Sequence, residues 1–151
     1  MAPVYVYGVA PSGNSQKAIL ACQLMGVQYE LRIVANLIGK EAEVAGSAKS
    51  PDFLRLNPRG TVPVLIDVNS PSELASKYGL DGEFHCEEGL VVNESAGILT
   101  YLALKYAPCW YNVHDPVVAG RVNNWLAFAA NEIHNSLLKV IRLYCILEHL
   151  L

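Results

Sequence analysis

The chain has 151 residues, of which 52% are hydrophobic and 17% charged, and its net charge is −3 with an isoelectric point near 5.8. This composition is typical of a globular protein and excludes a disordered or collagen-like chain. The slight acidic excess argues against a nucleic-acid-binding protein and against a polybasic membrane anchor. We therefore expect neither a nucleic acid nor a membrane among its partners.

Cysteine and hydropathy patterns predict the cellular compartment. The four cysteines are too far apart in the sequence to form a metal knuckle or a redox pair, and the four histidines lack metal-ligand spacing. No apolar run reaches the roughly 18 residues that a membrane span needs, and the first residues lack the pattern of a signal peptide. We expect a cytoplasmic protein with free thiols and no metal site.

A strand, a helix and a second strand are predicted at the start of the chain. Residues 4–7 are β-branched and aromatic, which favours a buried strand. A turn-rich segment follows, and from Gln16 the apolar spacing becomes helical until Gly26. Residues 28–34 then alternate as in a half-buried strand. The residues expected on its buried face are Tyr29, Leu31 and Ile33, and those on its exposed face are Glu30 and Arg32. This order favours a βαβ unit with a parallel strand pair.

The next elements are predicted around two prolines. Ser50 and Pro51 suit the N-cap and the first position of a short helix. Residues 61–67 predict a strand. Because proline cannot donate to a β-ladder, Pro63 indicates a sheet edge, a strand end or a cis turn. The acidic, glycine-containing residues 68–89 are expected to form an insertion.

Two more helices are predicted in the rest of the chain. A short strand at residues 90–92 leads to Glu94 and Ser95, which begin a helix that ends before Pro108. Asp115 and the proline after it predict the start of a long final helix. The apolar residues of that helix keep near-helical spacing over about seven turns and point around most of its circumference. Such a surface predicts association with another surface.

Three segments in this order form a joint pattern. They are the turn with Ser12, Asn14 and Ser15, the segment Asn57-Pro-Arg-Gly-Thr-Val-Pro-Val-Leu65, and the segment Glu94-Ser95-Ala-Gly-Ile-Leu-Thr-Tyr-Leu102. Together they resemble the glutathione transferase family. The resemblance implies an α/β fold, with a thioredoxin-like βαβ-α-ββα domain at residues 1–107. Residues 108–151 would then be the start of a truncated all-helical domain.

The resemblance implies where glutathione binds. Val62 and the cis Pro63 would bond the main chain of its cysteinyl part. A helix start favours an anion, so Glu94 and Ser95 suit the ammonium and carboxylate of a γ-glutamyl group, while Lys40 is a candidate for the glycine carboxylate. From the residues alone, Pro63 could equally blunt a strand end, and Glu94 with Ser95 could be a plain helix cap. Lys40 could likewise be a solvated lysine, and Arg59 an interface or loop charge.

Thiol activation is predicted in the turn after the first strand. A free thiol has a pKa near 8.5, and hydroxyl or amide donors at a helix N-terminus lower it. Family members use a Tyr, Ser or Cys near the end of this strand, which implies Ser12 first, Asn14 second and Ser15 third as the catalytic residue. No cysteine lies in the turn, and Tyr7 suits a core or interface position better.

The resemblance implies a transferase that conjugates the thiolate of glutathione to a hydrophobic electrophile. Glutathione would be a cosubstrate, and no metal or organic cofactor would be needed. The usual dimer of the family implies a homodimer, with the helix after Asp115 at or near the contact. The alternative is a non-catalytic interaction module, of the type found in translation elongation factors and aminoacyl-tRNA synthetase complexes.

Overall fold

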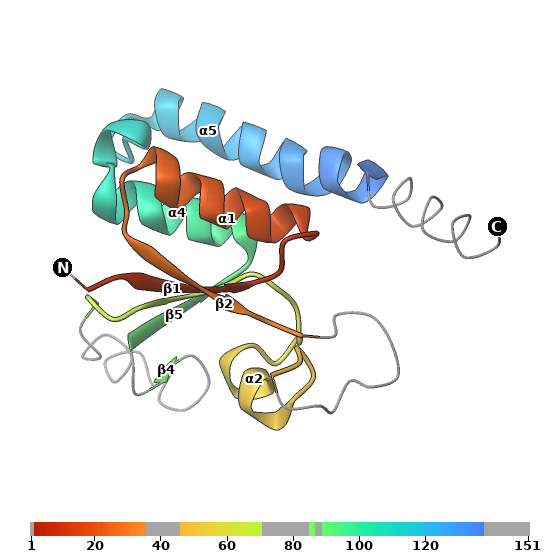
Figure 1. The fold of residues 1–151 in the computed structure, drawn as a ribbon. Helices are drawn as coiled ribbons and strands as arrows, with labels where there is room; N and C mark the ends of the chain where they lie inside the picture. The colour runs from red at the N-terminus through yellow and green to blue at the C-terminus, as the bar shows by residue number, and fades with distance from the viewer. Residues whose placement is uncertain (1, 36–45, 71–84, 87–88, 138–151) are drawn as a thin grey trace. The chain divides into compact units, whose positions relative to one another are not determined.

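A mixed β-sheet with the strand order β2-β1-β3-β5-β4 forms the centre of the first part of the chain (Figure 1). The computed structural model describes residues 2–35, 46–70, 85–86 and 89–137. The strands are β1 (Val4–Gly8), β2 (Tyr29–Ile33), β3 (Val64–Asp67), β4 (His85–Cys86) and β5 (Gly89–Asn93). β1 and β2 pair in parallel, as predicted, and the other neighbours pair antiparallel. The two-residue strand β4, within the expected insertion, was not predicted.

Three helices of the described residues accompany the sheet. They are α1 (Gly13–Leu24), α2 (Pro51–Leu56) and α4 (Ser95–Tyr106). α1 begins three residues before the predicted start because Ser12, and no later residue, is its N-cap. Ser50 caps α2 as predicted, with its Oγ accepting from the backbone N–H of Phe53 at 3.3 Å. The chain divides into two compact units, residues 1–107 and 108–151.

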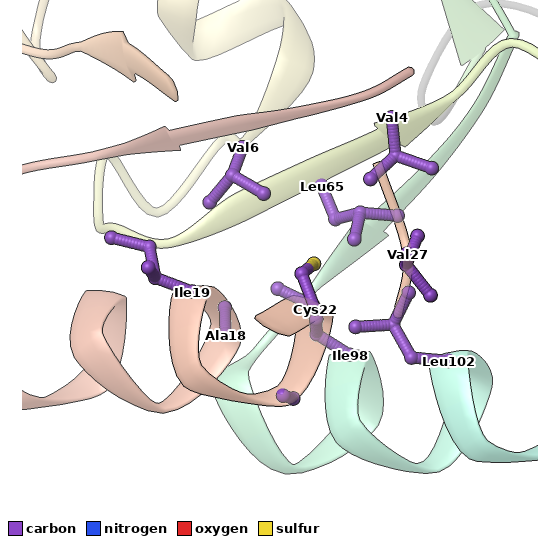
Figure 2. Close-up of a cluster of buried hydrophobic side chains, with 10 residues drawn as sticks. Val4, Val6, Ala18, Ile19, Cys22, Val27, Leu65, Ile98 and Leu102 are labelled. Carbon is purple, nitrogen blue, oxygen red and sulfur yellow. The ribbon is translucent and has the colours of Figure 1, made fainter. Parts of the chain in front are cut away.

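The core of the first unit lies on both faces of the sheet. Helices α1 and α4 cover one face, where the side chains of Ile19, Ile98 and Leu102 point toward Val6 and Leu65 (Figure 2). Helix α2 lies at the other face, where Phe53 packs in a second cluster with buried residues of β3 and β5. Full burial of one such large side chain contributes about 1.5–3 kcal/mol. This packing fixes the ends of β1 and β3 and the start of α4 relative to one another.

The predicted half-burial of β2 is wrong for two of its three apolar residues. Leu31 is 36% exposed and Ile33 is 65% exposed, because β2 is an edge strand of the sheet. On the opposite face, the Arg32 guanidinium lies 3.6 Å from the centre of the Tyr5 ring and donates to the Tyr7 hydroxyl at 2.7 Å. Stacking on aromatic rings allows an arginine to be half-buried, so the simple alternation of apolar residues is misleading here.

The second unit begins with a short 3₁₀ turn, η1 (Pro108–Trp110), followed by α5 (Pro116–Phe128). Asp115 is the N-cap of α5, as predicted, and its Oδ1 accepts from the backbone N–H groups of Val117 and Val118 at 2.9 and 3.2 Å. No residue of α5 is buried. Its exposed large apolar side chains are Val117, Val118, Trp125 and Phe128.

The long final helix contains a π-helical turn that the sequence did not indicate. A π-helical turn, η2 (Ala129–Ile133), follows α5, and the backbone N–H of His134 donates to the carbonyl of Ala129. A π turn contains one residue more than an α turn and therefore rotates the apolar positions after it. Helical residues continue to position 137. The part of the predicted association surface from residue 138 onward lies outside the described residues.

Candidate functional site

Ser12 is placed at the positive end of α1. Its Oγ accepts a hydrogen bond from the backbone N–H of Ser15 at 3.3 Å, and its carbonyl accepts from the N–H of Gln16 at 2.9 Å. An N-cap hydroxyl used as an acceptor keeps its own hydrogen for donation. The side chain is half-buried. A reachable hydroxyl donor at a helix N-terminus suits an anionic group such as a thiolate.

Ser15 is placed differently from the other two candidates in the turn. It is fully buried, and its Oγ accepts from the backbone N–H of Val9 at 3.3 Å. A Cβ at Gly8 would lie 2.9 Å from both Cβ and Oγ of Ser15, so the end of β1 packs closely on this serine. A fully buried hydroxyl is out of reach of a bound ligand. Ser12 and Asn14 are therefore the better candidates for thiol activation.

Asn14 connects the turn after β1 with the start of α4. Its Oδ1 accepts from the Oγ of Ser95 at 3.2 Å, although these residues are 81 positions apart in the sequence. The same Oδ1 accepts from Nζ of Lys17 at 2.9 Å. Ser95 is buried and is the first residue of α4. The structure thus brings two of the three predicted segments into direct contact.

Glu94 precedes α4 with an unusual backbone conformation. Its φ is 67°. Every other residue with positive φ in the described ranges is a glycine. This region is unfavourable for a glutamate, and such strain is found mostly at functional sites. Its side chain makes no capping bond to α4. Instead, Oε1 accepts from Nη1 of Arg59 at 2.6 Å, with both side chains largely exposed.

The loop between α2 and β3 holds Arg59 and the cis Val62–Pro63 peptide bond. Asn57 is buried, and its Nδ2 donates to the carbonyl of Thr61 at 2.8 Å while its Oδ1 accepts from the N–H of Arg59 at 3.2 Å. The pairing of β1 with β3 ends at Tyr7 and Val64, so Val62 lies outside this ladder. The predicted cis turn is confirmed. The ion pair of Arg59 with Glu94 links this third segment to the other two.

Sequence reasoning missed two cations at this site. Arg59 was interpreted as a loop or interface charge, and Lys17 was given no role. The partner of Arg59 is 35 positions away, which no local pattern encodes. Lys17 bonds Asn14 at the local i, i+3 spacing of a helix, and its role depends on the distant contact of Asn14 with Ser95. Lys40, the cation that was predicted for this site, lies outside the described residues.

A buried charge network occupies the opposite end of β3. The fully buried Asp67 accepts at Oδ2 from Nζ of Lys105 at 2.8 Å and from the hydroxyls of Tyr101 and Tyr106 at 2.7 and 2.6 Å. Its Oδ1 accepts from the backbone N–H of Asn69. Burial alone would raise the pKa of Asp67, but these hydrogen bonds outweigh it and lower the pKa to about 2. The network connects β3 with α4 and lies away from the cis-proline loop.

Two further kinds of feature are absent from the described residues. No group of histidine, cysteine, aspartate and glutamate side chains in those ranges is arranged to hold a metal ion. Among the helices of the same ranges, none is both long enough and apolar enough to span a membrane.

Comparison with known proteins gives consistent matches. A family model described as glutathione S-transferase, N-terminal domain, matches residues 11–105. The chain is 27% identical over 135 residues to glutathione S-transferase 3 of Zea mays, a match that covers 89% of this chain and 49% of that protein. The chain spans about half the length of the curated relatives it matches.

Solved structures of the same group are similar in fold. A delta-class glutathione transferase of Nilaparvata lugens has a TM-score of 0.66 and 28% identity, over 89% of this chain and 51% of that one. The theta-class glutathione S-transferase of the citrus canker pathogen Xanthomonas axonopodis pv. citri, solved with glutathione bound, has a TM-score of 0.64 and 25% identity. That match covers 89% of this chain and 52% of the other. The predicted thioredoxin-like fold is confirmed.

Proposed function

The chain belongs to the glutathione S-transferase family, and from this membership we propose that it binds glutathione and conjugates the thiolate to a hydrophobic electrophile. The observation that carries the proposal is the 3.2 Å hydrogen bond between Ser95 Oγ and Asn14 Oδ1. It joins the segment suited to the γ-glutamyl group with the segment suited to the thiol. A tripeptide that binds one of them at one end is therefore held near the other.

Each part of glutathione has a complementary group in the proposed site. The carboxylate of Glu94 takes the γ-glutamyl ammonium, and the N–H groups at the start of α4 take the γ-glutamyl carboxylate. Ser95 adds a donor when its hydroxyl hydrogen turns from Asn14 Oδ1 to the bound carboxylate. The main chain of Val62 bonds the cysteinyl residue, because the peptide before the cis proline lies outside the ladder of β3. Lys40 remains the proposed partner of the glycine carboxylate.

The proposed chemistry needs the thiolate form of glutathione. The thiol proton leaves to solvent, and the Ser12 hydroxyl at the N-terminus of α1 stabilises the sulfur anion. The sulfur then attacks the electrophilic carbon, a carbon–sulfur bond forms, and a leaving group such as chloride departs with its bonding electrons. Asn14 is the second candidate for contact with the sulfur. Ser15, which is buried, is the third.

We also propose a cytoplasmic homodimer. Cys22 and Cys109 are free thiols, which is typical of a reducing compartment. The exposed apolar side chains of α5, among them Trp125 at 66% and Phe128 at 43% exposure, support a contact surface on this helix. The matches to named transferases support an enzyme over the interaction-module alternative.

Binding and turnover test this proposal together. The chain is applied to a glutathione-affinity column, and conjugation of glutathione to a chlorodinitrobenzene is then followed by absorbance. We expect retention and turnover, and we expect Ser95→Ala to weaken glutathione binding in calorimetry by about 1–3 kcal/mol, because a charged ligand group loses a donor. Thr100→Ala, further along the same helix, is the matched control and should leave affinity unchanged.

The outcomes distinguish a failure of the proposed function from a failure of the proposed γ-glutamyl site. Retention without turnover would favour the interaction module over the enzyme. Absence of any glutathione binding by the unmodified chain would refute the proposed function. Equal affinity of the Ser95→Ala variant and the unmodified chain would refute the assignment of the γ-glutamyl site alone.

A further inference from the structure

Lys17 is a cation in an electrostatically unfavourable place. It lies in the N-terminal half of α1, and its Nζ reaches back toward the N-terminus to donate to Asn14 Oδ1 at 2.9 Å. A helix N-terminus is positive and favours anions, while cations are favoured at the C-terminus. The side chain is also part-buried. Burial lowers the pKa of Lys17, because water stabilises the ammonium less well there.

No carboxylate of the described residues compensates this charge. The first turn of α1 contains no acidic residue. The titratable side chains on α1 and on its packing neighbours β1 and α4 are Tyr5, Tyr7, Cys22, Glu94, Tyr101, Lys105 and Tyr106.

Each of these groups is engaged elsewhere. The two β1 tyrosines contact Arg32 on the opposite face of the sheet. Glu94 pairs with Arg59, and the three titratable groups within α4 bond Asp67. Burial raises the pKa of the Cys22 thiol to about 11, which keeps it neutral. A part-buried cation that has no anionic partner in these ranges favours an anion placed beside it.

We propose that Lys17 is a positioning residue of the thiol subsite, which holds Asn14 against Ser95 and places a positive charge where the glutathione thiolate forms. The inference rests on the proposed function and adds a residue to it. The thiol releases its proton to solvent, and the ammonium of Lys17 favours the resulting anion over the neutral thiol. Because Asn14 Oδ1 accepts from both Lys17 and Ser95, the cation lies one hydrogen-bonded residue from the start of α4 and contacts a residue of the proposed thiol turn.

The test compares neutral and charged replacements of Lys17. Lys17→Met removes the charge, Lys17→Arg keeps it, and Lys17→Gln is a second neutral variant if the methionine variant does not fold. Arg55→Met, which removes an exposed cation on α2, controls for the change in net charge. For each protein, the pH dependence of kcat/KM for conjugation is measured, together with binding of S-methylglutathione, which has no ionisable thiol.

We expect Lys17→Met to raise the apparent pKa of the bound thiol, so that kcat/KM falls about threefold to tenfold below that pKa and converges with the unmodified chain above it. Lys17→Arg and Arg55→Met should keep the original profile, and S-methylglutathione should bind all variants within about twofold. An unchanged pH profile for the neutral variants would overturn the inference, and so would an equal loss of S-methylglutathione binding. If the unmodified chain bound neither ligand, the proposed function would fail with it.

Discussion

Replacement of Asp67 tests the energetic role of the buried network at the end of β3. The carboxylate has a pKa of about 2 in the folded protein against 3.8 in an ordinary environment. At about 1.4 kcal/mol per pH unit, this difference of nearly two units corresponds to about 2–3 kcal/mol of stability. Because the folded pKa is the lower one, the contribution is complete above the ordinary pKa. It is lost as the pH falls from about 5 toward 2.

We therefore expect Asp67→Asn to lower the free energy of unfolding by about 2–3 kcal/mol near neutral pH, since the Lys105 ammonium also loses its counter-charge. Urea unfolding followed by far-UV circular dichroism at several pH values measures the effect. The difference in free energy of unfolding between the Asp67→Asn variant and the unmodified chain should become smaller as the pH approaches the pKa of Asp67 in the folded protein. Asp52→Asn is the matched control, because that carboxylate pairs with Arg55 at 87% exposure and should change little. A difference in free energy of unfolding that did not change with pH would refute the stabilising role of the ionised Asp67.

Two further predictions concern the catalytic turn and the assembly. Ser12→Ala should lower kcat for conjugation about tenfold to a hundredfold while KM for glutathione stays nearly constant, because the hydroxyl acts on the developing thiolate. Ser12→Thr keeps the hydroxyl and should retain most activity. An alanine variant with the full rate would transfer the role to Asn14. Sedimentation at micromolar concentration should give about twice the monomer mass of 16.5 kDa, and a non-associating monomer would contradict a contact surface on α5.

Local chemistry explains why much of the fold could be predicted from the sequence. Serine and aspartate N-caps followed by proline identify the starts of α2 and α5, since the side chain and the fixed φ of proline both act within one turn. Pro63, just before β3, indicated a sheet edge, a strand end or a cis turn, and the structure has the cis bond. These features depend on neighbouring residues and are therefore visible in the sequence.

The errors have both distant and local causes. Leu31 and Ile33 are exposed because β2 is at the edge of the sheet, and Arg32 is half-buried because it stacks on Tyr5 of the neighbouring strand. The start of α1 is a local error: apolar spacing places it at Gln16, whereas the Ser12 cap, which accepts from the N–H of Ser15, begins the helix at Gly13.

The candidate site was predictable in its segments but not in its contacts. Ser12, Glu94 and Ser95 were identified from the joint pattern of three segments. The bond of Asn14 to Ser95 spans 81 positions, and the pairing of Glu94 with Arg59 spans 35. Hydrophobic periodicity carries no information about such polar pairs. The burial of Ser15 likewise follows from the close approach of Gly8, which only the packed structure reveals.

Glutathione binding across the turn after β1, the cis-proline loop and the start of α4 is tested most directly by titrating the isotope-labelled chain with glutathione and following its backbone amide signals by NMR. We predict saturable shifts at Asn14, Val62 and Ser95, with little change at Asn69 beside the Asp67 network. An unchanged spectrum, or shifts confined to the Asp67 end of the sheet, would contradict a glutathione site at these three segments.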